Sequence, residues 1–279
     1  MTLPVATLSI FLVSILAGLV GSVLGLGGGI IIVPALTLLF GYEIRTAVAA
    51  SAVAVIATST GAAIAYLRDH ITNTRIAMLL EVGTTLGALS GALVAGLLPA
   101  RFMFLLFGLL MAYSAWSMFQ ARKAELPSGV KPDRLSERLR LGSSYYDQAL
   151  GRHVEYESTG TIPGLLLMYI SGALAGLLGI GGGAFKVLAM DQVMRLPIKV
   201  STATSNFMIG VTAAAGATVY FVRGDVEPLV AGPVALGVLL GAIIGARVMV
   251  RLKGTTLRKL FIPVLVYIAL QMAWKGVQG

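Results

Sequence analysis

Hydrophobic positions along this chain fall into long, uninterrupted blocks, and polar positions gather in the connectors between them. Each block is long enough for a helix to cross a bilayer, which needs about 20 apolar residues. The pattern therefore predicts an all-α polytopic membrane protein. The blocks cover residues 3–41, 46–67, 76–98, 102–120, 161–190, 199–222, 228–250 and 256–275.

The first block is too long to be one membrane helix. It runs without a charge from Leu3 to Phe40, which as a single helix would extend about 57 Å, against about 30 Å of hydrocarbon. The glycine string Gly25–Gly29 marks a natural break, since glycine weakens a helix. A matching string, Gly179–Gly183, lies in the block that begins at residue 161. We predict a helical hairpin at each string.

The chain is an internal repeat with an offset of 154 residues. Without any gap, 21 of 75 positions are identical between residues 18–92 and 172–246, whereas apolar composition alone gives roughly a tenth, so duplication is the better explanation. The two halves are joined by a basic stretch. We divide the chain into a first transmembrane repeat (1–120), a basic linker (121–160) and a second transmembrane repeat (161–279).

Composition narrows the functional class. The chain is 57% hydrophobic and only 12% charged, far from a soluble domain. Its formal charge of +9 comes from residues that flank membrane segments, so we expect a lipid bilayer as partner and no nucleic acid. There are no cysteines, and both histidines, His70 and His153, lie in polar connectors. We therefore expect no metal, no cofactor and no enzyme.

Charge bias predicts the topology. The basic linker 121–160 should face the cytoplasm, whereas the connector with Asp225 and Glu227 suits the outside. Both connectors lie on their expected sides of the membrane only if block 161–190 turns back at its glycines. The same reasoning applied to the first half predicts that it is inverted relative to the second. We predict five segments in each half, or alternatively eight crossings and two re-entrant hairpins, with a short helix at 133–141. The basic linker residues are Arg122, Lys123, Lys131, Arg134, Arg138, Arg140 and Arg152.

The glycine strings predict an anion site. The second arm of each hairpin begins at the glycines, where the first amide groups lack intrahelical partners and the helix dipole is positive. Two such ends that meet near the middle of the membrane would suit a small anion. The alternative is a tight turn that only packs helices. The candidate residues are Gly25, Gly27, Gly28, Gly29, Gly179, Gly181, Gly182 and Gly183.

Two charged residues inside the apolar blocks are further candidates. Lys186 lies one turn after the second glycine triplet, and Ile32 holds its place in the first half. It either complements the anion or extends its long side chain to an interface. Glu81 either carries a coupled proton, pairs with Lys186, or lies near the cytoplasmic edge. The last alternative is favoured because Arg75 precedes Glu81 by only six residues. Asp191 is expected at a boundary.

Polar side chains at the start of the next helix complete the candidate site. Ser51 matches Ser205 in the repeat. Thr204 and Asn206 flank Ser205, and Ala52 occupies the position of the first half that matches Asn206. Their hydroxyl and amide groups either donate to an oxyanion or form hydrogen bonds between helices.

Glycines also recur at every fourth position in one block of each half. This spacing predicts faces where helices pack closely. Near block ends, Trp116 and Trp274 are expected as interface anchors. The recurring glycines are Gly83, Gly87 and Gly91, and Gly237, Gly241 and Gly245.

These motifs resemble a known family. Both Gly18-Leu-Val-Gly-Ser-Val-Leu-Gly-Leu-Gly-Gly-Gly29 and Gly172-Ala-Leu-Ala-Gly-Leu-Leu-Gly-Ile-Gly-Gly-Gly183 are similar to the paired signatures of the TauE/SafE sulfite exporter family, as is Ser201-Thr-Ala-Thr-Ser-Asn-Phe-Met208. The resemblance implies a transporter of the cytoplasmic membrane that moves sulfite, sulfoacetate or other small sulfur-containing or organic anions. By position, it makes the glycines, Ser51, Ser205 and Asn206 the candidate site.

The main functional hypothesis is an anion exporter that works as a uniporter. A negative interior favours export by about 2.3 kcal/mol per charge and 100 mV. One alternative is a proton-coupled importer with Glu81 as the carrier. Another is a membrane protein that does not transport but assists assembly or senses a ligand through residues 121–160.

Overall fold

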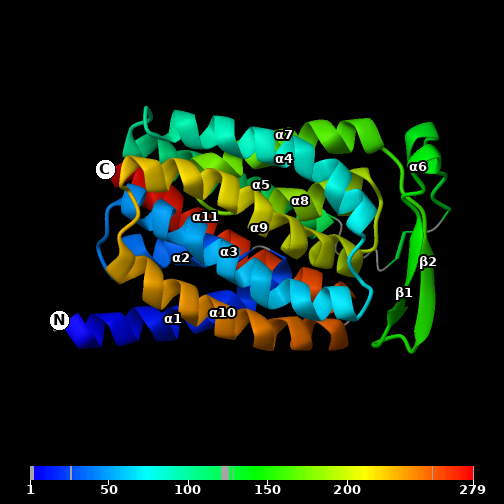
Figure 1. Ribbon diagram of the computed structural model, residues 1–279, viewed down its shortest axis with the longest axis horizontal. Coiled ribbons are helices and arrows are strands. Elements are labelled where there is room, and N and C mark those ends of the chain that lie inside the picture. Colours follow the sequence, from blue (N-terminus) through cyan, green and yellow to red (C-terminus); the bar gives the residue numbers. More distant parts are fainter. Residues whose placement is uncertain (1–2, 26, 121–125, 128, 253, 279) are drawn as a thin grey trace.

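The computed structural model is a helical bundle with a small folded unit at one end (Figure 1). It describes residues 3–25, 27–120, 126–127, 129–252 and 254–278. The first half contributes α1 (Leu3–Leu24), α2 (Gly29–Pro34) with a π-helix (Ala35–Leu39), α3 (Ile44–Arg68), α4 (Thr74–Ala95) and α5 (Ala100–Gln120). The second half contributes α7 (Thr161–Leu178), α8 (Gly183–Leu188) with a π-helix (Ala189–Val193), α9 (Ile198–Arg223), α10 (Pro228–Arg251) and α11 (Gly254–Gln278).

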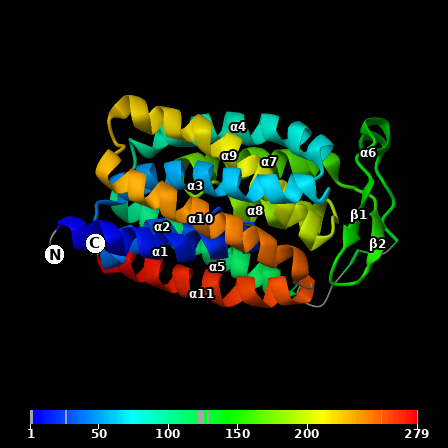
Figure 2. The same ribbon diagram turned by 60° about the horizontal axis from the view of Figure 1, so that its bottom comes forward.

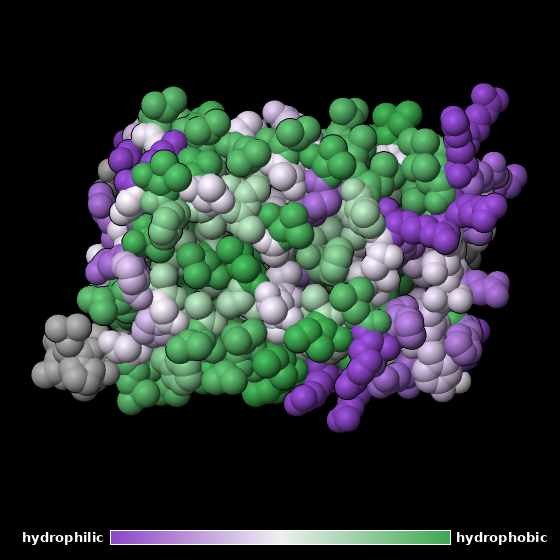
Figure 3. Space-filling view, in the orientation of Figure 1, coloured by the Kyte–Doolittle hydropathy of each residue, from purple (hydrophilic) through white to green (hydrophobic). Residues whose placement is uncertain are grey.

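The surface of the bundle is that of a membrane protein. Six of the described helices, α1, α3, α4, α7, α9 and α10, are long and apolar enough to cross a bilayer. Hydrophobic residues cover the middle of the face in Figure 3, whereas hydrophilic residues gather at the end near the folded unit. Trp116 and Trp274 are exposed near helix ends, as expected of interface anchors.

Each half contains the five predicted segments, and equivalent segments start at opposite ends of the bundle. In Figure 1 the chain enters α1 at the left, where the N-terminus lies, and enters α7 at the right, next to the folded unit. The second arm of each hairpin is short, and its last turns are π-helical (Ala35–Leu39 and Ala189–Val193). Such π-turns are frequent at functional sites.

The two halves are interleaved rather than side by side. A Cβ atom at Gly87 of α4 would overlap the carbonyl oxygen of Tyr169 in α7, and one at Gly241 of α10 would overlap that of Ile15 in α1. These positions are equivalent in the repeat, so each hairpin packs on a helix of the opposite half. The predicted close packing is confirmed. In the turned view of Figure 2, α5 and α11 also lie side by side.

The linker is more structured than the sequence analysis expected. The predicted helix is present as α6 (Arg134–Leu139), capped by Asp133, which accepts a hydrogen bond from the Ser136 amide (2.7 Å). A hairpin of two strands, β1 (Ser143–Asp147) and β2 (Arg152–Tyr156), follows it. The all-α prediction is therefore wrong for this segment. We call residues 129–160 the cap; Arg122, Lys123 and, in the first glycine string, Leu26 lie outside the described residues.

Candidate functional site

Both glycine strings break their helices in the same way. Gly25, Gly27 and Gly28 have φ values of 71°, 72° and 46°. Their equivalents Gly179, Gly181 and Gly182 have values of 65°, 69° and 68°. A residue with a Cβ atom adopts this left-handed region at a cost, so the glycines permit the turn. The predicted interruptions are confirmed at both places.

The two turns meet in the middle of the bundle. A Cβ atom at Gly27 would overlap Ile209 and lie 3.3 Å from Val55, and one at Gly181 would lie 2.6 Å from Val55 and 3.3 Å from Ile209. Val55 and Ile209 are equivalent residues near the centres of α3 and α9. A Cβ atom at Gly29 would also lie 3.0 Å from the carbonyl oxygen of Gly179. The hairpin tips therefore face each other around one pair of apolar side chains.

Two buried serines hold the tips reciprocally. Ser51 Oγ donates to the carbonyl oxygen of Gly179 at 2.7 Å, and Ser205 Oγ donates to that of Gly25 at 2.9 Å. Each serine thus binds the hairpin of the opposite half. The structure shows the interhelical alternative for both hydroxyl groups, because their protons are already donated. Donation to an anion would require one of these bonds to exchange.

Two equivalent tyrosines bind the hairpin of their own half, one turn before the glycines. The Tyr66 hydroxyl donates to the carbonyl oxygen of Ser22 at 2.9 Å, and the Tyr220 hydroxyl donates to that of Gly176. The match of Tyr66 with Tyr220 is visible in the repeat, but the sequence did not show what these hydroxyl groups bind.

Asn206 and Thr204 differ in their relation to the tips. Asn206 Nδ2 donates to the carbonyl oxygen of Ser22 at 2.8 Å, and its buried Oδ1 has no hydrogen-bond partner within the described part of the chain. Asn206 therefore has an acceptor atom to offer near the first hairpin. Thr204 Oγ1 instead accepts from the Asn73 amide at the start of α4 (3.1 Å). The structure does not bring Thr204 to the glycines.

Lys186 is fully buried, and an acidic residue lies close to it. Its Nζ donates to Thr212 Oγ1 and lies 3.9 Å from Glu81 Oε2. The Thr212 hydroxyl donates to Glu81 Oε1 at 2.6 Å, and the Thr85 hydroxyl donates to the same atom at 3.1 Å. The alternative in which Lys186 reaches an interface is wrong. Of the three alternatives for Glu81, the structure shows the pair with Lys186.

Asp191 and Thr212 also belong to the second hairpin and its surroundings. Asp191, expected at a boundary, lies in the π-helix that ends the second hairpin, and its side chain is buried. Thr212, which links Lys186 to Glu81, was not singled out from the sequence. Its match with Thr58 in the repeat was the available signal.

Crevices flank both hairpins at equivalent places. A cavity of about 720 Å³ lies between the first hairpin and α11, with Ile31, Pro34 and Tyr267 in its wall. Its counterpart between the second hairpin and α5 measures about 90 Å³, with Phe185 and Leu188 in its wall. Both crevices are mainly apolar.

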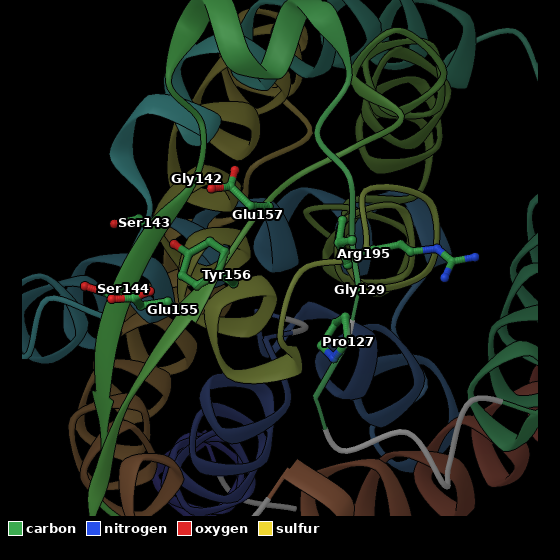
Figure 4. A pocket seen from close by; sticks show the side chains of 10 residues that line it. Pro127, Gly129, Gly142, Ser143, Ser144, Glu155, Tyr156, Glu157 and Arg195 are labelled. Carbon is green, nitrogen blue, oxygen red and sulfur yellow. The ribbon is translucent and has the colours of Figure 1, made fainter.

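A third cavity, of about 580 Å³, belongs to the cap and not to the hairpins (Figure 4). Pro127 and Gly129 form one side, and Tyr156 and Glu157 form the other. The guanidinium group of Arg195 points away from Glu157. The opposing charges at this cavity are not arranged as an ion pair.

Comparison with known proteins assigns the family. The sequence profile of the sulfite exporter TauE/SafE family matches residues 10–272. The chain therefore belongs to the TauE/SafE family and is a multi-pass membrane protein of a transporter family. The resemblance of its glycine motifs to that family is confirmed.

Curated relatives agree with this family. The probable membrane transporter protein YunE of Bacillus subtilis is 28% identical over 94% of this chain and 96% of its own length. YdhB of the same organism is 25% identical over 85% of this chain and 88% of its own length. MJ0441 of Methanocaldococcus jannaschii is 24% identical over 76% of this chain and 71% of its own length. Both are also described as probable membrane transporter proteins. No solved structure matches the chain.

Proposed function

We propose that this chain transports small anions across the cytoplasmic membrane by alternating access, and that it exports sulfite or an organosulfonate. The observation that carries the proposal is the meeting of two glycine turns at the centre of the bundle, around Val55 and Ile209. Each turn begins a short helix whose first amide groups point toward the turn. At membrane depth, such ends stabilise a negative charge without an added cation.

The arrangement of the halves favours alternating access. Equivalent helices start at opposite ends of the bundle (Figure 1), as inverted repeats do in many transporters. With the basic linker in the cytoplasm, the same central tips would face either side in turn. Each hairpin is held by a serine of the opposite half, Ser51 or Ser205, so movement of one half carries the other half's tip with it.

Flux measured with purified protein in liposomes tests the proposal. Radiolabelled sulfite and methanesulfonate, loaded inside, should leave faster when a potassium–valinomycin potential makes the interior negative. The driving force is about 2.3 kcal/mol per 100 mV for each uncompensated charge. Protein-free liposomes and the Gly181→Ala protein serve as controls. Absence of flux for every anion tested would refute transport, and flux indifferent to potential would refute a uniporter.

One observation favours a second candidate, a proton-coupled importer. Glu81 lies 3.9 Å from the buried Lys186, and an acid within a membrane segment is a frequent proton carrier. If an anion replaced Glu81 beside Lys186, the displaced carboxylate would lose its counter-charge and would have to bind a proton to become neutral. The Glu81→Gln protein separates the two candidates. It should stop a coupled importer, whereas a uniporter should retain flux that follows the membrane potential.

A further inference from the structure

The cap is attached to the transmembrane bundle by a buried ion pair. Lys199 Nζ, in the first turn of α9, donates to Asp147 Oδ1 at 2.8 Å, with both side chains about 5% exposed or less. The same Nζ lies 3.4 Å from the carbonyl oxygen of Val250 at the end of α10. Burial opposes ionisation of Asp147, but Lys199 and the amides of Leu150 and Ala149 outweigh it, so the pKa of Asp147 lies below its usual range.

Asn73 forms a second attachment. Its Oδ1 caps α4 by accepting from the Ile76 amide (3.1 Å). Its Nδ2 donates to the carbonyl oxygen of Leu141 at 2.8 Å and to the Tyr156 hydroxyl at 3.0 Å, both in the cap. Its backbone amide donates to Thr204 in α9. One residue therefore joins the cap to a helix of each half: its side chain bonds the cap and caps α4, and its backbone amide bonds α9.

A third attachment is made by Asp133, which precedes α6. Its Oδ2 accepts from the Thr161 amide at 2.7 Å, and its Oδ1 accepts from the Thr161 hydroxyl at 3.0 Å. Thr161 is the first residue of α7. The cap thus fastens the adjacent ends of α4, α7 and α9, which belong to different halves, and Lys199 links the end of α9 to the end of α10.

This end of the bundle is linked to the hairpin tips. Thr204, bonded to Asn73, is followed by Ser205, whose hydroxyl holds the carbonyl oxygen of Gly25. Alternating access needs the helix ends on one side of the membrane to separate. Helices fastened together by one folded unit cannot separate on that side until the unit is released.

We propose that the cap is a cytoplasmic gate: it is closed in this structure, and it must release the Lys199–Asp147 contact before an anion from the cytoplasm reaches the hairpin tips. The inference rests on the proposed function, because it supplies the gate for that transport. A buried ion pair suits a latch that opens and closes. Separation returns both charges to water, which recovers their desolvation cost.

Thiol labelling tests the gate without any need for flux. The chain has no cysteines, so one introduced cysteine reports on one position. Ser201→Cys places a near-isosteric thiol at a fully buried position two residues after Lys199. Ser144→Cys, on the exposed surface of β1, is the accessible reference. In inside-out vesicles, a membrane-impermeant maleimide should modify Ser144→Cys rapidly and Ser201→Cys at least about tenfold more slowly.

Opening the latch should expose the buried thiol. Adding Asp147→Asn to Ser201→Cys should raise its labelling rate at least about tenfold, because Lys199 loses its counter-charge. The matched control is Asp69→Asn, which removes the exposed pair Arg68–Asp69 (3.3 Å) at another helix end and should leave the rate unchanged. The gate is overturned if Ser201→Cys labels as fast as Ser144→Cys without Asp147→Asn, or if Asp147→Asn has no effect.

A reversible lock provides a second readout. In a protein with Lys199→Cys and Asp147→Cys, a short bis-methanethiosulfonate joins the cap to α9, and dithiothreitol cleaves the link. Linking should reduce sulfite flux in liposomes at least about tenfold, and reduction should restore it. Undiminished flux in the linked protein overturns the gate but leaves transport intact. If no anion moves even before linking, the proposed transport fails, and the labelling rates alone decide whether the cap opens.

Discussion

The two hairpins have the same backbone and different chemistry. Both turn through three glycines in the left-handed region, and both receive a serine hydroxyl from the opposite half. Yet the second hairpin carries Lys186 where the first has Ile32, and Asp191 where the first has Thr37. Because the first hairpin forms the same turn without a charge, the charge is not needed for the turn.

The difference extends to the helices around each hairpin. Glu81, the acidic partner of Lys186, is matched by Ala235 on the helix that packs against the first hairpin. Thr212, between the charges, is matched by Thr58, whose hydroxyl donates to the carbonyl oxygen of Ala54 in its own helix (2.9 Å). The repeat therefore supplies a symmetric framework, and an ion pair between the two halves is added beside the second hairpin. Under the proposed function, the framework serves folding and anion entry, and the ion pair sets the properties of the anion site.

The largest expected effect comes from removing the charge in the second hairpin. Lys186→Met leaves Glu81 without its counter-charge and should destabilise the protein by about 3–5 kcal/mol, as when a buried pair is broken. Ile32→Met, the matched change in the first hairpin, should cost less than about 1.5 kcal/mol. Thermal unfolding in detergent measures both. Equal losses would mean that the two hairpins do not differ as described.

A double substitution sharpens that test. Lys186→Ile with Glu81→Ala gives the second hairpin and the helix beside it the side chains that the first hairpin and its neighbouring helix have at these positions, Ile32 and Ala235. Stability should return to within about 1–2 kcal/mol of the native protein, since no unpaired charge remains. Anion flux should stay at least about tenfold lower than native, which corresponds to about 1.4 kcal/mol at the site. Native flux in this protein would show that the pair serves only packing.

The glycine turns should respond alike in both halves. Gly27→Ala and Gly181→Ala each force a Cβ atom into a left-handed conformation and against Ile209 or Val55. The strain costs about 1–2 kcal/mol and the overlap about 1–3 kcal/mol. Both proteins should lose flux. A large loss in one half only, measured by flux and thermal unfolding together, would break the equivalence of the tips.

Smaller losses are expected at the serines. Ser51→Ala or Ser205→Ala leaves a buried glycine carbonyl without its donor, at about 1–3 kcal/mol. The control is Thr218→Val, which removes an exposed intrahelical bond to Ala214 (2.9 Å). Thermal unfolding should rank both serines well above the control and close to each other. A serine as tolerant as Thr218 would not be holding the opposite tip.

The smallest effect distinguishes the starts of α3 and α9. Lys199 is buried under the cap, whereas its equivalent Arg45 is exposed. Because the pKa of Asp147 is lowered in the folded state, its contribution to stability is complete above its unfolded pKa of about 3.9 and disappears as pH falls through the lower folded value. Melting temperatures measured from pH 6 to 3 should fall below about pH 4, and less so in Asp147→Asn.

Local features of the fold were predictable because they depend on short stretches of chain. The length of the first apolar block required a break, and the glycine string Gly25–Gly29 showed where. The four-residue spacing of Gly83, Gly87 and Gly91 indicated a close-packed face. In each case the requirement comes from bilayer thickness or from helix geometry, which act on neighbouring residues.

Features that depend on distant parts of the chain were not predictable. The glycine face of α4 packs on α7 of the other half, and periodicity does not name a partner. Glu81 and Lys186 are paired across 105 residues, and the sequence left that pair as one of three alternatives. The strands 143–147 and 152–156 were missed because the residue types do not follow the alternation of burial: Tyr145 is buried and Tyr146 exposed, and the buried Asp147 is polar.

The interleaving of the halves has a consequence for biosynthesis. When the ribosome has delivered α4, the surface that Gly87 will contact on α7 has not yet been made. Until α7 has been inserted as far as Ala173, which Gly91 contacts, the glycine face of α4 has no helix of the second half to pack against. In that interval it is exposed to lipid acyl chains. Neither half therefore completes its helix packing on its own. Packing is completed only after the second half has been translated and inserted.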